Sequence, residues 1–371
     1  MEDIKRILFI TPFAPSEIGA AMKFTKKTIE DLSKKYFVDV VYFRTEGEED
    51  YLLDSPNIRI LEEINVNRIR RIYSIVQRPF NFPIFSTRYS WTLAKRLQKY
   101  NSRYHYDLLF LDHSQCFIYG TLFPEVKKIM MSHDVIYQRV SRQSGSILSK
   151  WCYLTERKYL NQINATIFSF SEKDKSLIKD LYGIDSAAIP GNIDSLAIDA
   201  LPINIVDNYI FFGQWVRQDN LSGLIWFFDE VYPQCLGKTK FTIIGRGLPQ
   251  QVLDSLKDKT NVEYLGFVDN PYQLIANSKA VLSPLFTGAG VKFKVLEALA
   301  CGTPVIGTDI AFEGIPPISA NFMIKSVSPQ EYLNAMNNVG NISVSERKKE
   351  KMHFIKEYMN NSIVNQIDNI L

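Results

Sequence analysis

Residues 282–306 constrain the fold of this chain more than any other stretch of its sequence. An apolar segment that begins at Leu282 leads into a turn with Gly288 and Gly290. An amphipathic segment follows, and a Gly-Thr-Pro break precedes a second apolar segment at Val305. Apolar strands separated by an amphipathic helix are typical of a parallel strand–helix–strand unit. We therefore expect an α/β fold with the glycine turn at the carboxyl end of the first strand.

The glycine turn and the helix after it predict an anion-binding site. Glycine lets the backbone approach a ligand closely, and the first N–H groups of a helix lack partners and carry partial positive charge. Lys292 and Lys294 add formal charge, and Glu297 could hold sugar hydroxyls further along the helix. The pattern favours a sugar attached to a nucleotide diphosphate. The alternative is a tight turn with an i,i+3 surface pair, but lysines in a first helical turn are unfavourable unless an anion shares the site.

Strands alternate with helices on both sides of an expected linker. The 371 residues suit two domains of about 150–200 residues each, and Pro190, Gly191 and Pro202 interrupt the stretch 185–207. We predict a Rossmann-like domain over 1–195, a second one over 196–350, and a C-terminal helical segment over 351–371 that packs back towards the first domain. The expected architecture is two doubly wound sheets that face a central cleft, with ligands at their carboxyl edges.

Composition argues against several other classes of protein. The net charge of +3 is too small to indicate nucleic acid, and no apolar run approaches the roughly 18 residues that span a bilayer. The four cysteines are scattered, which is typical of reduced thiols in a cytosolic protein rather than of a zinc site. The first strand is followed by Thr11-Pro-Phe-Ala-Pro, not by the Gly-x-Gly-x-x-Gly turn of a Rossmann dehydrogenase. We expect a cytoplasmic protein.

Several short segments accompany residues 282–306 in a characteristic order, and they cover nearly the whole chain. They lie at 169–172, 189–194, 211–213, 243–247 and 264–268. Together they resemble the GT-B-fold glycosyltransferases, particularly family 4, the glycosyl transferases group 1. The resemblance implies an enzyme that moves a sugar from a nucleotide-diphosphate donor to an acceptor hydroxyl with retention of the anomeric configuration. A lipid-linked saccharide of bacterial surface polysaccharide (lipopolysaccharide, capsule or exopolysaccharide) is the expected acceptor.

The same resemblance assigns the donor-binding residues. Glu297 is expected to accept hydrogen bonds from the ribose, and Phe267 and Val268 to receive the base. The diphosphate is expected on Lys292 and on the backbone of four residues, Gly288, Ala289, Gly290 and Val291. Further candidates for donor contact are Gly19, Gly213, Arg217, Arg246 and Lys294.

Two departures from the family pattern concern the donor sugar and the phosphates. The family has two glutamates separated by seven residues, but the first of these positions is Ala289. The family also tends to have an arginine directly after the first strand of the second domain, where this chain has Gln214. Arg217 and Arg246 are then either phosphate contacts or solvated loop residues. Lys292 and Lys294 can supply the positive charge that a leaving diphosphate requires.

Two polar pairs follow apolar strands in the first domain and are expected at the carboxyl edge of its sheet. His133 and Asp134 form one pair, and a histidine there resembles the family's donor-sugar contact. Asp112 and His113 form the other, a candidate for acceptor or donor-sugar contact. The alternative for each pair is a loop residue with ordinary structural partners. We assign catalytic roles to His133, Asp134 and Lys292.

No Asp-x-Asp triplet, which holds a metal on the diphosphate in many glycosyltransferases, occurs in the sequence. We therefore expect lysines and the helix dipole to neutralise the diphosphate, with no metal and no other cofactor.

The window 64–106 is basic and aromatic and predicts contact with a membrane. It has no acidic residue between Ile64 and Tyr106, and its arginines include Arg68, Arg70, Arg71 and Arg78. Cations near an anionic leaflet contribute about 1 kcal/mol each, and aromatic side chains favour the interface. We expect peripheral docking on the inner face of the cytoplasmic membrane. A solvated helical face over core aromatics is the alternative, and nucleic acid is disfavoured because no binding motif accompanies the window.

Two other functions remain open at this stage. A GT-B-fold epimerase would act on the nucleotide sugar itself and would need more carboxylates or histidines at its site. A non-catalytic partner of another transferase would bind the nucleotide sugar without turnover, and Ala289 in place of a glutamate favours it.

Overall fold

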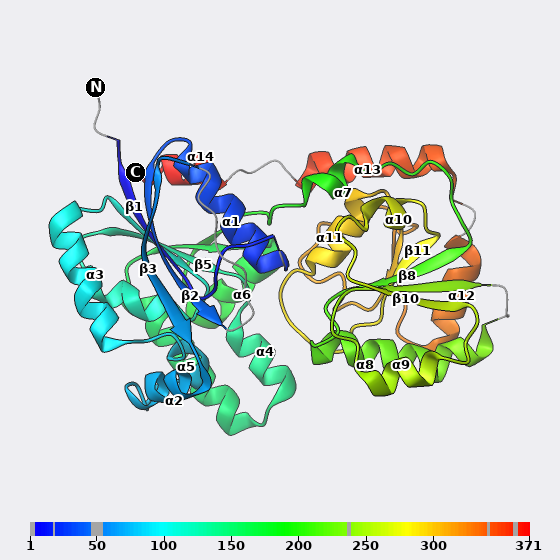
Figure 1. Cartoon of the computed structure of the whole chain (residues 1–371), viewed down its shortest axis with the longest axis horizontal. Coiled ribbons are helices and arrows are strands. Elements are labelled where there is room, and N and C mark those ends of the chain that lie inside the picture. Colours follow the sequence, from blue (N-terminus) through cyan, green and yellow to red (C-terminus); the bar gives the residue numbers. More distant parts are fainter. Residues whose placement is uncertain (1–3, 18, 46–54, 236–238, 340–341, 359–362) are drawn as a thin grey trace. The chain divides into compact units, whose positions relative to one another are not determined.

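The computed structural model describes residues 4–17, 19–45, 55–235, 239–339, 342–358 and 363–371, and these form two compact units (Figure 1). One unit comprises residues 1–192 together with 361–371, and the other comprises residues 193–360. The chain therefore passes from the first unit to the second beside Asn192 and returns near its C-terminal end. The predicted C-terminal segment, 351–371, is divided between the two units, because residues 351–358 lie in a helix of the second unit and residues 363–371 lie in the first.

The first unit has a parallel sheet of seven strands in the order β3-β2-β1-β4-β5-β6-β7. Their bounds are β1 Arg6–Thr11, β2 Phe37–Thr45, β3 Ile58–Val66, β4 Leu108–Asp112, β5 Lys127–Ser132, β6 Thr166–Ser169 and β7 Ser186–Ala188. The central strands are continuous apolar runs that are almost completely buried, as expected for a parallel sheet with helices on both faces.

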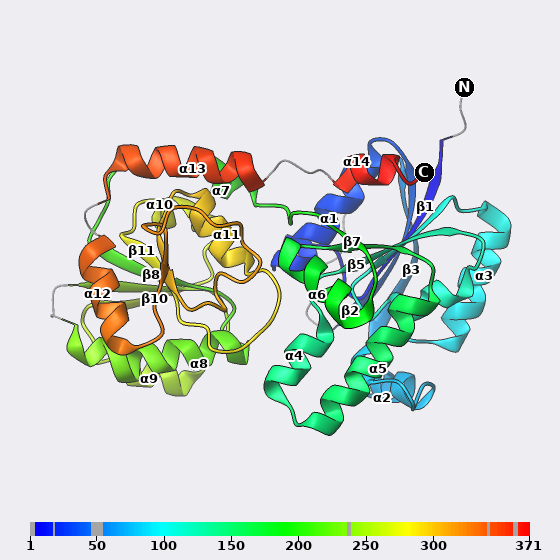
Figure 2. The same ribbon diagram turned by 180° about the vertical axis from the view of Figure 1, so that it is seen from behind.

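The helices of the first unit are α1 Ala20–Ser33, α2 Arg68–Val76, α3 Trp91–Tyr104, α4 Ile136–Gln143, α5 Ser146–Gln162, α6 Glu172–Tyr182 and α14 Ile363–Asp368. Short 3₁₀ turns lie at Pro83–Phe85 and Phe117–Leu122. Helix α5 packs against both α4 and α6 (Figure 2). The C-terminal helix α14 packs against α1, and Asp368 accepts hydrogen bonds from Lys35 and Tyr36.

The second unit has a parallel sheet of six strands in the order β10-β9-β8-β11-β12-β13. Its strands are β8 Asn208–Phe212, β9 Lys240–Ile244, β10 Val262–Gly266, β11 Ala280–Ser283, β12 Val305–Gly307 and β13 Met323–Lys325. Its helices are α7 Ser195–Asp199, α8 Gln218–Trp226, α9 Gln250–Leu256, α10 Tyr272–Ala276, α11 Phe293–Ala300, α12 Pro329–Val339 and α13 Val344–Tyr358. A π-helical turn, Phe227–Val231, and a 3₁₀ turn, Tyr232–Gln234, follow α8.

The two sheets confirm the predicted α/β fold with two doubly wound, Rossmann-like units. In each sheet the strand order reverses between two neighbours, β1 and β4 in the first unit and β8 and β11 in the second. Such reversals open a crevice at the carboxyl ends of the strands, where ligands bind in this class of fold. Among the described residues, no helix has the length and apolar character needed to cross a bilayer.

Helix α13 anchors the second unit through two buried cations. The Nζ atom of Lys351 lies within 3.2 Å of four backbone carbonyl oxygens, three near the end of α7 and that of Ala300 at the end of α11. Arg347 donates to the carbonyls of Ser278 and Lys279, just before β11. The last carbonyls of a helix lack partners within that helix, so Lys351 satisfies them and fixes α7 and α11 relative to each other.

Glu156 of α5 anchors the start of α4 in the first unit. Its carboxylate accepts hydrogen bonds from the backbone N–H groups of Ile136 and Tyr137 at 2.9 and 2.8 Å, and from the Tyr182 hydroxyl at 2.7 Å. Complete burial of the carboxyl raises the pKa of Glu156 to about 7, although these three hydrogen bonds act in the opposite direction.

Glu156→Gln should remove a pH dependence from the stability of the first unit. The native pKa of about 7 lies above the ordinary value of 4.5, so the folded chain retains a proton that the unfolded chain releases between these pH values. Stability should therefore fall as pH rises through this window, by at most about 1.4 kcal/mol per pH unit. Urea unfolding at pH 5, 6 and 7 should give a shallower slope for the variant, whereas the surface variant Glu125→Gln should keep the wild-type slope. Equal slopes for Glu156→Gln and wild type would contradict the assignment.

Candidate functional site

The candidate residues of both units lie just past the carboxyl ends of central strands. In the second unit, Gly213 follows β8, Arg246 follows β9, Phe267 follows β10, and the 288–294 segment follows β11. In the first unit, Asp112 ends β4 and His133 follows β5. These are the positions at which the strand order of each sheet opens a crevice.

The glycine turn of the second unit wraps around Lys292. Gly288 and Gly290 have φ angles of 112° and 72°, a region that glycine adopts without strain. The Nζ atom of Lys292 lies 3.1 Å from the carbonyl oxygen of Ala289 and 2.5 Å from that of Gly290. Helix α11 begins at the next residue, Phe293. The ammonium group is therefore held beside the turn at the start of the helix.

Three cations and one carboxylate gather beside this turn. The Nζ atom of Lys294 donates to Asn220 Oδ1 at 2.8 Å, and Arg217 pairs with Asp219 at 3.0 Å. The pKa of Lys294 is lowered to about 7, mainly by burial; the charges of Arg217 and Lys292 also lower it, and that of Asp219 opposes them. An anion bound here would favour the charged form of Lys294. The structure thus brings Arg217 and Lys294 together, although they are far apart in the sequence.

The ends of β8, β9 and β10 approach each other so closely that only glycine fits. The backbone N–H of Gly245 donates to the carbonyl oxygen of Gly266 at 2.7 Å, and a Cβ atom on Gly245 would lie 1.7 Å from the carbonyl oxygen of Gly213. Beside them, the guanidinium of Arg246 lies 3.9 Å from the centre of the exposed Phe267 ring. Arg246 is therefore held by a cation–π contact next to the expected base position at Phe267 and Val268.

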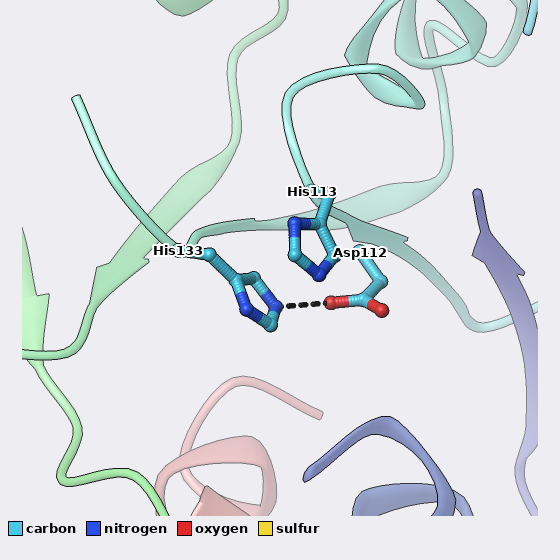
Figure 3. Close-up of side chains that lie close together, drawn as sticks. All are labelled: Asp112, His113 and His133. Carbon is cyan, nitrogen blue, oxygen red and sulfur yellow. Dashed lines mark hydrogen bonds and ion pairs between the residues drawn. The ribbon is translucent and has the colours of Figure 1, made fainter. Parts of the chain in front are cut away.

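In the first unit, three side chains from neighbouring strands form a polar cluster (Figure 3). His133 Nε2 lies 2.6 Å from Asp112 Oδ1, and the hydroxyls of Thr11 and Thr25 donate to Asp112 Oδ2 at 2.9 and 2.7 Å. The ring of His113 stacks on that of His133, with centroids 3.2 Å apart. Phe24 and Phe170 contact the His133 ring edge to face, which fixes its orientation.

Asp112 is an ionised carboxylate in a fully buried position. Burial alone would raise the pKa of Asp112, but the two histidines and the hydrogen bonds from His133 and Thr25 lower it to about 2. An ionised Asp112 accepts a hydrogen bond from Nε2–H of His133, and this leaves Nδ1 of that ring as the atom able to take a proton. Burial, followed by the charge of His133, lowers the pKa of His113 well below its ordinary value. His113 also has a left-handed backbone, with φ of 61°.

These three residues are also the described residues that could hold a metal ion, because their ligand atoms lie within 4.8 Å of one another. Their arrangement fits a metal poorly. Both oxygens of Asp112 already accept hydrogen bonds, so a metal would have to displace His133 or the threonine hydroxyls from this carboxylate. The cluster is better described as a carboxylate that orients a histidine.

The remaining predicted residues have other surroundings. Asp134 pairs with Arg139 at 3.0 Å rather than joining the cluster. Gly19 precedes α1 with φ of 90°. Arg78 stacks on Tyr89 and donates to its hydroxyl at 2.6 Å, whereas Arg68 and Arg71 are exposed on α2.

Sequence patterns missed three features of these surroundings. Thr11 and Thr25 give no signal because isolated threonines occur throughout the chain. Tyr272 next to Glu297 gives none either, because isolated tyrosines are also spread throughout the chain. The apolar side chains of α2 could have been found, since Ile69, Ile72, Tyr73 and Val76 recur at helical spacing among the arginines.

Known proteins are similar to this chain in both sequence and fold. Residues 207–340 match the family described as glycosyl transferases group 1. A 44.6 kDa protein of the cps region of Klebsiella pneumoniae is 25% identical over 235 residues, which cover 58% of this chain and 60% of that protein. The match thus spans less than two thirds of the relative.

Two solved structures have a similar fold over nearly the full length. Sucrose-phosphate synthase from Thermosynechococcus elongatus has a TM-score of 0.68 at 13% identity, covering 99% of this chain and 98% of that one. HepE of Anabaena, solved in complex with UDP and glucose, has a TM-score of 0.68 at 15% identity, covering 98% of each chain. Residues 207–340 are therefore similar to the glycosyl transferases group 1, and the chain as a whole has the GT-B fold.

Proposed function

We propose that this chain transfers a sugar from a nucleotide-diphosphate donor to an acceptor hydroxyl. The observation that carries the proposal is the cationic glycine turn at the start of α11, inside the segment that matches the glycosyl transferases group 1. The similar HepE of Anabaena binds UDP and glucose in its solved complex, which supports a nucleotide-sugar donor. Within the second unit, Glu297 would bind the ribose, and Phe267 and Val268 the base.

The cations of the second unit supply the charge that departure of the diphosphate requires. Lys292 is fixed beside the turn, and Arg217 and Lys294 lie next to it, with Asp219 opposing part of their charge. Positive groups placed before the reaction stabilise charge that develops as the glycosidic bond breaks. On this basis we propose a metal-independent reaction. Retention of the anomeric configuration rests on the family resemblance.

The polar cluster of the first unit provides the acid–base chemistry. Because ionised Asp112 holds Nε2–H of His133, the ring presents its other nitrogen to a sugar hydroxyl. Asp112 is completely buried and both its oxygens accept hydrogen bonds, so it acts through His133. Asp134 is a less suitable proton acceptor since it pairs with Arg139.

The exposed face of α2 supports docking on an anionic membrane. Ile69, Ile72, Tyr73 and Val76 lie at i, i+3, i+4 and i+7, and each is between 58% and 77% exposed. We call these four side chains the α2 stripe. Arg68 and Arg71 are exposed on the same helix, and such a combination of apolar and cationic groups suits the interface of an anionic leaflet. A lipid-linked acceptor is consistent with this surface and with the relative from a cps region.

Nucleotide binding tests the donor site directly. A thermal-shift screen with UDP, GDP, ADP and CMP should give a specific shift with a nucleoside diphosphate. Glu297→Gln should then lower the affinity for that nucleoside diphosphate by about tenfold, because a hydrogen bond to a charged group contributes about 1.5–3 kcal/mol. Glu263→Gln, which alters an exposed carboxylate on β10, is the matched control and should bind like wild type. Absence of any diphosphate binding by wild type would refute the proposed function.

Asp112→Asn should lower turnover of the donor sugar nucleotide by at least about tenfold, or ~1.4 kcal/mol. The neutral amide no longer fixes the proton on Nε2 of His133, while the nucleotide, held by the second unit, should bind as before. Release of nucleoside diphosphate measures turnover, and calorimetry measures binding. Thr25→Val removes one hydrogen bond to the same carboxylate without changing its charge and should have a smaller effect. If Asp112→Asn turned over the donor as fast as wild type does, the polar cluster would have a structural role only.

Membrane docking can be separated from folding by sedimentation with vesicles that contain phosphatidylglycerol. Ile69→Asp with Ile72→Asp should abolish co-sedimentation, because charged groups replace the inserted apolar surface. Replacing Arg68, Arg70 and Arg71 by alanine should weaken it most at low salt. Met352→Asp, at an exposed apolar position on α13, is the matched control. Unchanged sedimentation of the α2 stripe variant would leave the helix as an ordinary solvated surface.

The same assays address the alternatives that the sequence left open. Conversion of the donor into an isomeric nucleotide sugar without an acceptor would indicate an epimerase. Tight nucleotide binding with no turnover would indicate a non-catalytic partner of another transferase, the function that Ala289 favours.

A further inference from the structure

An acidic side chain lies among the cations of the glycine turn in the second unit. Asp219 is in the first turn of α8, and its Oδ2 atom accepts a hydrogen bond from Arg217 at 3.0 Å. A Cβ atom on Gly288 would lie 3.4 Å from this oxygen, 3.7 Å from Cε of Lys292 and 4.0 Å from the Nζ atom of that lysine. The carboxylate of Asp219 and the ammonium group of Lys292 therefore border the same space beside the turn.

Asp219 is ionised and largely covered by protein. Its side chain is 17% exposed, whereas that of Arg217 is 59% exposed. Burial alone would raise the pKa of Asp219, but the charge and the hydrogen bond of Arg217, its own backbone N–H and the charge of Lys294 lower it below the ordinary value. Because water screens a covered charge less than an exposed one, an anion bound at the turn would be repelled by Asp219.

The start of a helix favours an acidic side chain, and this accounts for an aspartate in the first turn of α8. It does not account for a carboxylate oxygen directed at the turn where an anion is expected. A negative charge at that place lowers the affinity for every anion, and it does so most for the anion with the greatest charge. Asp219 can therefore distinguish ligands by their charge.

The donor and the product of the proposed reaction differ in charge at one phosphate. In a nucleotide sugar both phosphates are esterified on two sides, and each carries one negative charge. After transfer of the sugar the terminal phosphate has a second ionisable oxygen with a pKa of about 6, which adds nearly one more charge at neutral pH. The free nucleoside diphosphate is thus the more highly charged ligand.

We propose that Asp219 makes the donor site selective for charge, so that the site favours the nucleotide sugar over the free nucleoside diphosphate and promotes release of the product. The inference rests on the proposed function, in which the glycine turn binds the diphosphate. The cations beside the turn attract both ligands, and Asp219 offsets the part of that attraction which the additional charge of the product would gain. Asp219 is a specificity-determining residue and takes no part in breaking the glycosidic bond.

The test compares two ligands by calorimetry at neutral pH. One is the nucleoside diphosphate (UDP, GDP or ADP) that the thermal-shift screen selects, and the other is the same nucleotide with a methyl ester on its terminal phosphate. The ester has the charge of a nucleotide sugar, and its use does not require that the donor sugar be known. Asp219→Asn should bind the free diphosphate at least about fivefold more tightly than wild type does, but the ester only about twofold more tightly, because the ester lacks the additional charge.

Three further measurements separate the charge of Asp219 from its place in the helix. The difference between the two ligands should shrink at high salt, because ions screen the repulsion. Asp219→Glu retains the charge and should keep the wild-type ratio of the two dissociation constants. Asp229→Asn, which removes an exposed carboxylate from the π-helical turn after α8, is the matched control and should bind both ligands as wild type does.

Two results for Asp219→Asn would overturn the inference while the proposed function stands. If both affinities stayed as in wild type or rose by the same factor, Asp219 would not distinguish the ligands. If both affinities fell, the carboxylate would serve only to hold Arg217 and the start of α8. A wild-type chain that binds neither UDP, GDP nor ADP would instead refute the proposed function together with this inference, so the two failures are distinguishable.

Discussion

Both units depend on one constraint, which is that parallel strands of a sheet end at a common edge. Each connection must return along a helix, so the loops that follow the strands gather at that edge. In the second unit this brings the ends of β8, β9 and β10 close enough that Gly245 cannot carry a side chain. In the first unit it brings β4 and β5 into register, and Asp112 and His133 meet although 21 residues separate them. The chemistry of each unit follows from this convergence.

Burial of charge gives the two candidate sites opposite characters. In the first unit, hydroxyl and imidazole groups surround Asp112 and keep it ionised in the interior. In the second unit, burial and two neighbouring cations destabilise the charge of Lys294, as its lowered pKa shows. A compensated buried charge orients a neighbour, whereas a destabilised one creates affinity for a counter-ion. The first arrangement suits proton transfer and the second suits binding of a phosphate group.

The sequence was sufficient for the α/β fold and for the location of the glycine turn, because continuous apolar runs and paired glycines are local signals. It also placed His133 and Asp112 at one sheet edge. It could not show that Asp112 contacts His133 or that Asp134 pairs with Arg139, since the register of neighbouring strands is not encoded in either segment alone. The positions of Tyr272 and of Lys351 depend on helices packing from distant parts of the chain, and no periodicity indicates such contacts.

Lys351 and Arg347 show that the last long helix is part of the frame of the second unit. A truncated chain that ends after β13 would retain every residue of the glycine turn. It would lack Lys351, however, and so the carbonyl groups at the ends of α7 and α11 would lose this donor. Its six strands would be complete, yet the two helices that position Glu297 and Asp194 would be free to drift apart. The matched family segment, 207–340, contains neither α7 nor Lys351 and so lacks this connection. An expression boundary chosen from sequence similarity alone would remove Lys351, which connects the ends of α7 and α11.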